Sequence, residues 1–168
     1  EAKSKFVKVL SFCNRPESTI SRESDGVVHI DAGCEVGVAS TKAYTAQLAC
    51  IYLFTIFLGR LKWTITDEQA ETMLAELKGL PDKIETALRA EAEIVRIARK
   101  YHTAGDFLFL GRGINYPTAL EGALKLKEIS YIHATGYAAG EMKHGPIALI
   151  DEHMHVICIA PKGPVYEK

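Results

Sequence analysis

Short apolar runs alternate with longer periodic stretches along this chain of 168 residues. Runs rich in β-branched and aromatic residues predict strands over residues 6–12, 27–30, 107–110 and 155–160. Longer apolar or amphipathic stretches predict helices from residue 40 or 41 to about 58, and over 67–78, 81–101 and 117–131. Because strands alternate with helices, the chain is predicted to be an α/β protein with parallel sheets.

Several residues mark where the predicted helices begin and end. Gly59 is predicted to be the C-cap of the helix that precedes it. Thr66 and Gln69 have the spacing of a capping box, which predicts a helix start at residue 67. The sequence Gly79-Leu80-Pro81 interrupts the next stretch, and Pro81 suits the first turn of another helix.

Composition and charge exclude some classes of function. The net charge is −1, from 20 basic and 21 acidic residues, so nothing favours nucleic acid or an anionic membrane surface as a partner. The longest apolar run, residues 48–58, has about 11 residues, whereas a membrane span needs about 20. We therefore interpret it as a buried core helix. There is no signal peptide and no initiator Met, and strand-like runs lie close to both ends, so we expect a portion of a longer protein.

The cysteines give no sign of a metal site. They stand at positions 13, 34, 50 and 158 without a CxxC pair, a pattern typical of free, buried, reduced thiols in a cytosolic protein. The nearest approach to a zinc site is the set His153, His155 and Cys158, which lacks the usual ligand spacing. We predict neither a metal nor an organic cofactor.

Three charged residues of the helix predicted over 117–131 form the first candidate site. Glu121, Lys125 and Glu128 stand at i, i+4 and i+7, within about 60° of one another around a helix. A lysine between two carboxylates makes a tunable acid–base group, and an ionised glutamate can take a proton from a carbon next to a carbonyl or imine. The alternative is an exposed salt-bridge ladder, which is common on helices.

Three glycine-containing segments are further candidates, each with a structural alternative. Residues 111–116, GRGINY, connect a strand to a helix start and could approach an anion, or could simply be a tight turn. Tyr116 occupies the place of the last glycine in a dinucleotide fingerprint, which disfavours a Rossmann site. His144, within residues 140–146, could shuttle protons or be an ordinary surface or core histidine. The hydroxyls of Ser40 and Thr41 could bind sugar or phosphate, or could cap a helix.

Long segments of the chain resemble one enzyme family. Residues 32–45, AGCEVGVASTKAYT, resemble a segment of the first sugar isomerase (SIS) subdomain of the glucosamine-6-phosphate synthase family. Residues 109–134 and 136–151 resemble the opening of its second SIS subdomain, with KEISY and KHGP as the most specific parts. Cys34 departs from the small residue, Pro or Thr that is familiar there. The resemblance implies three-layer, flavodoxin-like SIS subdomains with parallel sheets, each incomplete here: the first over 1–65, linking helices over 66–97, and the second over 98–168.

The resemblance also implies a reaction and site residues. Members of the family convert fructose 6-phosphate and glutamine-derived ammonia to glucosamine 6-phosphate in the cytoplasm, as homodimers, with a glutaminase domain earlier in the same chain. Glu128 matches the residue that transfers the proton, His144 the histidine that aids ring opening from the neighbouring subunit, and Lys125 a lysine of the same site. Val38 and Ser40 match positions that line the sugar, and Glu121, which completes the charged cluster, is expected to bind the substrate with them.

The same resemblance implies that other parts of the active site lie outside this sequence. Phosphate-binding loops would precede Glu1, and a Schiff-base lysine would follow Lys168, so the fragment alone is expected to be inactive. The main alternative is a non-enzymatic SIS module that senses a sugar phosphate, which needs no base. A second alternative is a purely structural role for the charged cluster, between subunits.

Overall fold

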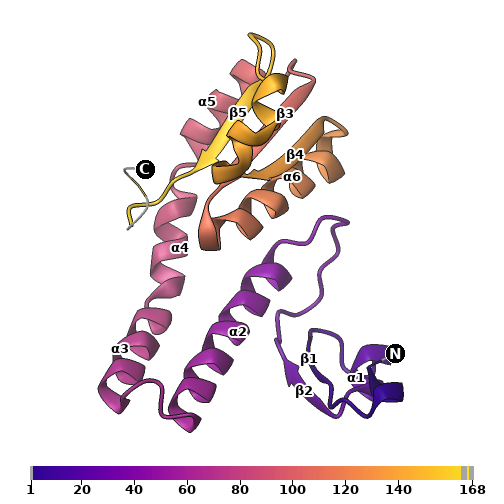
Figure 1. Ribbon diagram of the computed structural model, residues 1–168, viewed down its shortest axis with the longest axis vertical. Helices are drawn as coiled ribbons and strands as arrows, with labels where there is room; N and C mark the ends of the chain where they lie inside the picture. Colours follow the sequence, from indigo (N-terminus) through magenta and orange to yellow (C-terminus); the bar gives the residue numbers. More distant parts are fainter. Residues whose placement is uncertain (1, 164–165, 167–168) are drawn as a thin grey trace. The chain divides into compact units, whose positions relative to one another are not determined.

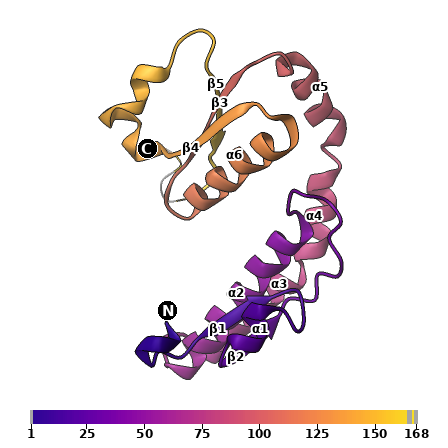
Figure 2. The same ribbon diagram turned by 90° about the vertical axis from the view of Figure 1, so that its right-hand side faces the viewer.

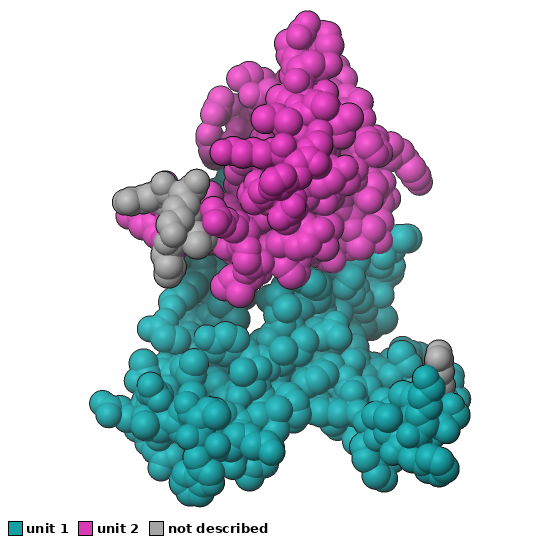
Figure 3. Space-filling model, in the orientation of Figure 1, with its two compact units in different colours: residues 1–90 teal, residues 91–168 magenta. Residues whose placement is uncertain are grey.

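The structure is a computed structural model that describes residues 2–163 and 166. The chain forms two compact units, residues 1–90 and 91–168, which Figure 3 shows in different colours. We refer to them as unit 1 and unit 2. The subdomain boundaries expected near residues 65 and 97 stay predictions.

Unit 1 contains a parallel two-stranded sheet (Figure 1). Strand β1 (Leu10–Cys13) pairs with β2 (Gly26–His29), and the short helix α1 (Thr19–Glu23) connects them. The first strand was predicted to begin at residue 6, which is wrong. Lys3–Lys5 form a 3₁₀ turn, η1, and Phe6 ends it with a left-handed φ of 59°. A residue in that conformation cannot continue an extended strand, so pairing begins only at β1.

Three helices complete unit 1: α2 (Lys42–Leu61), α3 (Asp67–Lys78) and α4 (Leu80–Leu88). Gly59 is not the C-cap of α2, because the helix continues past it and Lys62 takes that position. The glycine instead makes room for Ile65, since an added Cβ would lie 3.1 Å from Ile65 Cδ1. The Thr64 amide donates to the Gly59 carbonyl at 2.9 Å, so the chain folds back over this glycine.

The apolar helix α2 is not buried as predicted. Ile56 is its one buried residue, and 6% of its most apolar 18-residue window is buried. By length and hydropathy α2 also meets a criterion for a membrane span, a criterion that core helices of soluble proteins share. Its main contacts within unit 1 are to β1 and α3, including an edge-to-face contact of Phe54 with Phe12 at 5.6 Å. These two elements cover only part of the helix surface, which leaves the remaining apolar residues exposed.

Helix α3 begins at the capping box that the sequence predicts. The Gln69 amide donates to Thr66 Oγ1 at 3.2 Å, and the Thr66 amide donates to Gln69 Oε1 at 2.8 Å. The two bonds satisfy donors that the first helical turn would otherwise leave without partners. Asp67 and Glu68 add negative charge at the positive end of the helix dipole.

We expect Thr66→Ala to lower the free energy of unfolding by about 1 kcal/mol, because alanine removes the Oγ1 atom that accepts from the Gln69 amide. Thr72→Ala is the matched control, since the hydroxyl of Thr72 donates only to the Glu68 carbonyl within the same helix. The control is expected to change stability by less than about 0.5 kcal/mol. Denaturant unfolding monitored by circular dichroism measures both, and equal losses would contradict a capping role.

The single helix predicted over 81–101 is two helices. Helix α4 ends at Leu88, and α5 (Glu91–Tyr101) begins in unit 2. The Arg89 and Ala90 amides donate to the carbonyls three residues earlier, which tightens the last turn of α4. Residues 89 and 90, between the two helices, are neither glycine nor proline, so the helical sequence pattern continues across the break.

Unit 2 is a three-stranded parallel sheet with an α-helical crossover (Figure 2). The strand order is β4 (His133–Ala138), β3 (Asp106–Gly111), β5 (His155–Ile159), and helix α6 (Tyr116–Ser130) connects β3 to β4. The sequence predicted β3, α6 and β5 but not β4. The letters HATGYA contain no apolar run, and Gly136 is needed there because an added Cβ would lie 2.9 Å from Leu120 Cα of α6.

The core of unit 2 lies between α6 and the sheet. Its buried members come from β3, α6 and β4: Phe107, Phe109, Ala119, Ala123 and Ala134. The small alanines and Gly122, which faces the Phe109 ring, bring the helix close to the sheet. All four cysteines are free, as predicted, but those at positions 34 and 158 are exposed rather than buried. Cys158 belongs to β5, an edge strand of the sheet that the described residues form.

Candidate active site

Helix α6 presents two different faces. Ala119 and Ala123 are 0% and 1% exposed and pack on the sheet, whereas Glu121, Lys125 and Glu128 lie on another face and are half-buried. The helix starts directly after the 3₁₀ turn η2 (Gly113–Asn115), with Pro117 in its first turn. The small residues therefore determine how α6 packs on the sheet, and this packing also sets the position of its charged face.

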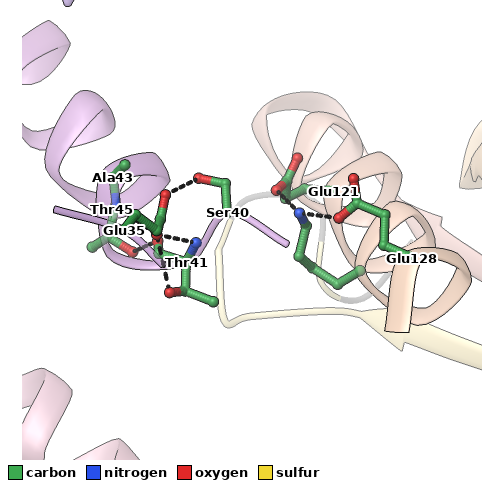
Figure 4. Close-up of polar contacts among 8 residues, drawn as sticks. Glu35, Ser40, Thr41, Ala43, Thr45, Glu121 and Glu128 are labelled. Atoms are coloured by element: carbon green, nitrogen blue, oxygen red, sulfur yellow. Dashed lines mark hydrogen bonds and ion pairs between the residues drawn. The ribbon is translucent and has the colours of Figure 1, made fainter. Parts of the chain in front are cut away.

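The structure brings the three charged residues together as predicted from their spacing (Figure 4). Lys125 Nζ lies 2.6 Å from Glu128 Oε2 and 3.4 Å from Glu121 Oε1. The hydrogen bond to Glu128 is the main cause that raises the pKa of Lys125, Glu121 adds to it, and burial opposes it. The ammonium is thus charged at neutral pH and bridges the two carboxylates.

The bonding pattern leaves part of Glu128 available for chemistry. Lys125 bonds to Oε2, and among the described residues nothing is bonded to Oε1. A carboxylate anchored through one oxygen and free at the other can take a proton from a bound ligand without losing its position. The exposed ladders elsewhere on the chain, such as Glu85–Arg89 with both side chains 73% exposed, lack this half-buried setting.

His144 lies in unit 2 but apart from these ion pairs. It is the last residue of the 3₁₀ turn η3 (Ala139–His144), and Gly145 follows it with φ of 138°. Its side chain is exposed, and no hydrogen bond or ion pair to another described residue holds it. The glycine permits the turn that presents the ring outward.

Val38 and Ser40 lie in unit 1, in the loop before α2. Val38 is 95% exposed, and Ser40 Oγ donates to Glu35 Oε2 at 3.1 Å. Thr41 is the N-cap residue of α2, as the capping alternative expects, but its side chain makes no capping hydrogen bond. The carboxylate of Glu35 accepts from the first-turn amides instead, at 2.7 Å from Thr41 N and 3.3 Å from Ala43 N (Figure 4).

Glu35 is the residue that sequence reasoning missed. An ordinary N-cap carboxylate belongs to the residue next to the helix, whereas Glu35 is seven residues before Lys42. Ser40 and Thr41 already offer ordinary capping residues directly before α2, so no local signal in the sequence pointed to Glu35.

The glycines of the segment 111–113 are explained by a tight turn. A Cβ on Gly111 would lie 2.2 Å from the Asn115 carbonyl oxygen, and Gly113 has a left-handed φ of 57°. The described residues, 2–163 and 166, contain no cluster of three or more side chains suited to a metal ion.

The class of protein follows from these features. Unit 2 is a parallel α/β domain whose crossover helix carries a carboxylate–lysine–carboxylate cluster, and unit 1 contains a second, smaller parallel sheet. The SIS domain family matches residues 1–57 and 100–168, and the chain belongs to this family. The predicted α/β fold with parallel sheets in partial SIS subdomains is confirmed.

The comparisons with known proteins agree with the resemblance seen in the sequence. A glutamine–fructose-6-phosphate aminotransferase (isomerizing) of Thermus thermophilus is 54% identical over 168 residues, which are 100% of this chain and 28% of that protein. The enzyme of the same name from Gloeobacter violaceus is 51% identical, over 99% of this chain and 28% of its own length. This chain therefore spans less than a third of the length of these relatives.

A solved structure extends the agreement to three dimensions. The C-terminal domain of glucosamine-fructose-6-phosphate aminotransferase from Francisella tularensis is 43% identical and superposes with a TM-score of 0.94, over 98% of this chain and 47% of that one. A glucosamine-6-phosphate deaminase from Thermotoga maritima, 20% identical with a TM-score of 0.67, shares the fold.

Proposed function

We propose that this chain is part of the isomerase region of a glutamine–fructose-6-phosphate aminotransferase, which converts fructose 6-phosphate and ammonia to glucosamine 6-phosphate. The observation that carries the proposal is the half-buried Lys125–Glu128 pair on α6, with Glu128 Oε1 free of protein partners among the described residues. The identity of 54% to an enzyme of that name supports the same reaction.

In this proposal Glu128 moves one proton between two carbons of the substrate. Ammonia adds at C2 of the opened sugar, and loss of water gives an imine. The imine nitrogen is protonated, and the free oxygen of Glu128 takes a proton from C1, which leaves a neutral enol-amine. Glu128 returns that proton to C2 while the C1 hydroxyl loses its own proton to solvent, which gives the aldehyde at C1 and the amine at C2. Lys125 keeps its charge throughout and holds the glutamate in place.

The other predicted residues act on the substrate in this proposal. His144 assists ring opening, because an imidazole can donate and accept a proton near neutral pH, and its exposed position suits delivery to the site of a neighbouring subunit. Val38 and Ser40 line the sugar, and Glu121 shares the ammonium of Lys125. The protein would act as a cytoplasmic homodimer, with ammonia supplied by a glutaminase domain of the same chain.

The test is turnover by the full-length protein that contains this sequence. With fructose 6-phosphate and glutamine we expect glucosamine 6-phosphate, and substrate deuterated at C1 should transfer part of its label to C2 or lose it to water. A sugar-phosphate sensor, the alternative, would bind the sugar phosphate in calorimetry without forming product. Binding without product would overturn the proposal, because the paired carboxylate of Glu128 would then have no catalytic role.

A further inference from the structure

The carboxylate of Glu35 holds the loop that precedes α2 through four hydrogen bonds. Oε1 accepts from Thr41 N at 2.7 Å, Thr41 Oγ1 at 3.2 Å and Ala43 N at 3.3 Å, and Oε2 accepts from Ser40 Oγ at 3.1 Å. Figure 4 shows these donors converging on one carboxylate. The loop closed in this way presents Val36 and Val38 outward, 93% and 95% exposed.

The direction of the Ser40 bond is fixed by the charge of Glu35. Bonds from the backbone, that of Thr41 first, lower the pKa of Glu35 to about 2, so the side chain is ionised at neutral pH. An ionised carboxylate can only accept hydrogen bonds. Ser40 therefore donates its one hydroxyl hydrogen to Glu35, and the hydroxyl can offer only its lone pairs to anything else.

This direction selects what Ser40 can bind. A sugar hydroxyl can donate a hydrogen bond to those lone pairs, whereas a phosphate dianion has no hydrogen to donate. Two first-turn amides of α2, those of Thr41 and Ala43, are likewise committed to Glu35 and are not free for an anion.

We propose that Glu35 is a positioning residue that makes Ser40 an acceptor for a hydroxyl of the substrate's carbohydrate part, and that Ser40 is not a ligand of its phosphate. The inference rests on the proposed function, because it assigns a role within the same sugar-phosphate site. Glu35 and Ser40 both belong to unit 1, so neither the charge of Glu35 nor its distance from Ser40 depends on unit 2.

Glu35→Gln tests the inference with little change in volume. The amide oxygen of glutamine can still accept from Thr41 and Ala43, but its NH₂ group would face Ser40 as a donor and reverse the hydroxyl. In the full-length protein we expect the KM for fructose 6-phosphate to rise about tenfold, with kcat changed less than about threefold, as for a contact made equally in ground and transition state.

Ser40→Ala is the second variant, and it keeps the hydrogen bonds that Glu35 accepts from the Thr41 and Ala43 amides. It should raise the KM about as much as Glu35→Gln, and the double variant should be no worse than either single one, because both remove the same contact. Inorganic phosphate, used as a competitive inhibitor, should inhibit wild type and variants with equal inhibition constants.

Two results would overturn the inference. If Ser40→Ala weakens inhibition by inorganic phosphate as much as it raises the KM, Ser40 donates to phosphate. If the two substitutions act additively, Glu35 has only the structural role of capping α2. If Glu35→Gln does not fold, Ser40→Ala alone still tests whether Ser40 binds the carbohydrate part or the phosphate. Wild-type protein without turnover would instead contradict the proposed function, and calorimetric binding of fructose 6-phosphate would then replace KM in both arms.

Discussion

Replacing Glu128 with glutamine is expected to lower kcat for glucosamine 6-phosphate formation by a factor of about 10² to 10⁴, the range that a positioned general base contributes. Glutamine keeps the size of the side chain but cannot take the proton from C1. Lys125 retains Glu121 as a partner at 3.4 Å, so the substitution does not leave the ammonium without an ion pair. The side chains of this cluster are 23% to 29% exposed, and we expect a stability change within about 1 kcal/mol.

The matched control is Glu85→Gln, which breaks an ion pair between a glutamate and the cation four residues later on another helix. It should leave kcat unchanged. Steady-state kinetics with ammonia as the nitrogen source, together with thermal unfolding and sedimentation, separate the roles. Loss of turnover in a folded, assembled Glu128→Gln protein supports catalysis. Dissociation of the assembly with kcat retained would show that the cluster is structural.

The second large effect is expected from Gly111→Ala, which should destabilise unit 2 by about 3 kcal/mol or more. The added Cβ would lie 2.2 Å from the Asn115 carbonyl oxygen, 2.6 Å from the Asn115 carbonyl carbon and 2.9 Å from Tyr116 Cα. All three are backbone atoms, which cannot rotate away as the end of a side chain can. Relief requires a shift of η2 and of the start of α6, the helix that carries the charged cluster.

Gly105→Ala is the control for this substitution. Gly105 lies just before β3, and an added Cβ there would meet nothing within 4 Å. Its stability should be unchanged or about 0.4–1 kcal/mol higher, because alanine restricts the unfolded chain. Thermal unfolding of the full-length protein, with limited proteolysis to locate the change, tests both variants. A Gly111→Ala protein as resistant as the control would mean that the turn can relax without cost.

The sequence by itself determined the elements whose signals are local. The capping box of Thr66 and Gln69, the apolar run of β3 and the i, i+4, i+7 spacing on α6 each depend on residues within two helical turns or one strand. Hydrogen bonds and side-chain contacts over such short distances are dictated by backbone geometry, so they can be read without knowing the rest of the fold. The long sequence motifs were also enough to identify the family.

Tertiary structure alone decided the features that depend on residues distant along the chain. Strand β4 has no apolar run, and it is a strand because β3 supplies its hydrogen bonds and Leu120 packs over Gly136. The exposure of α2 depends on how much of its surface β1 and α3 cover. Glu35 caps that helix from seven residues away, through a loop whose path no local rule fixes. In each case burial or hydrogen bonding is completed by a partner whose position follows from chain folding rather than from neighbouring sequence.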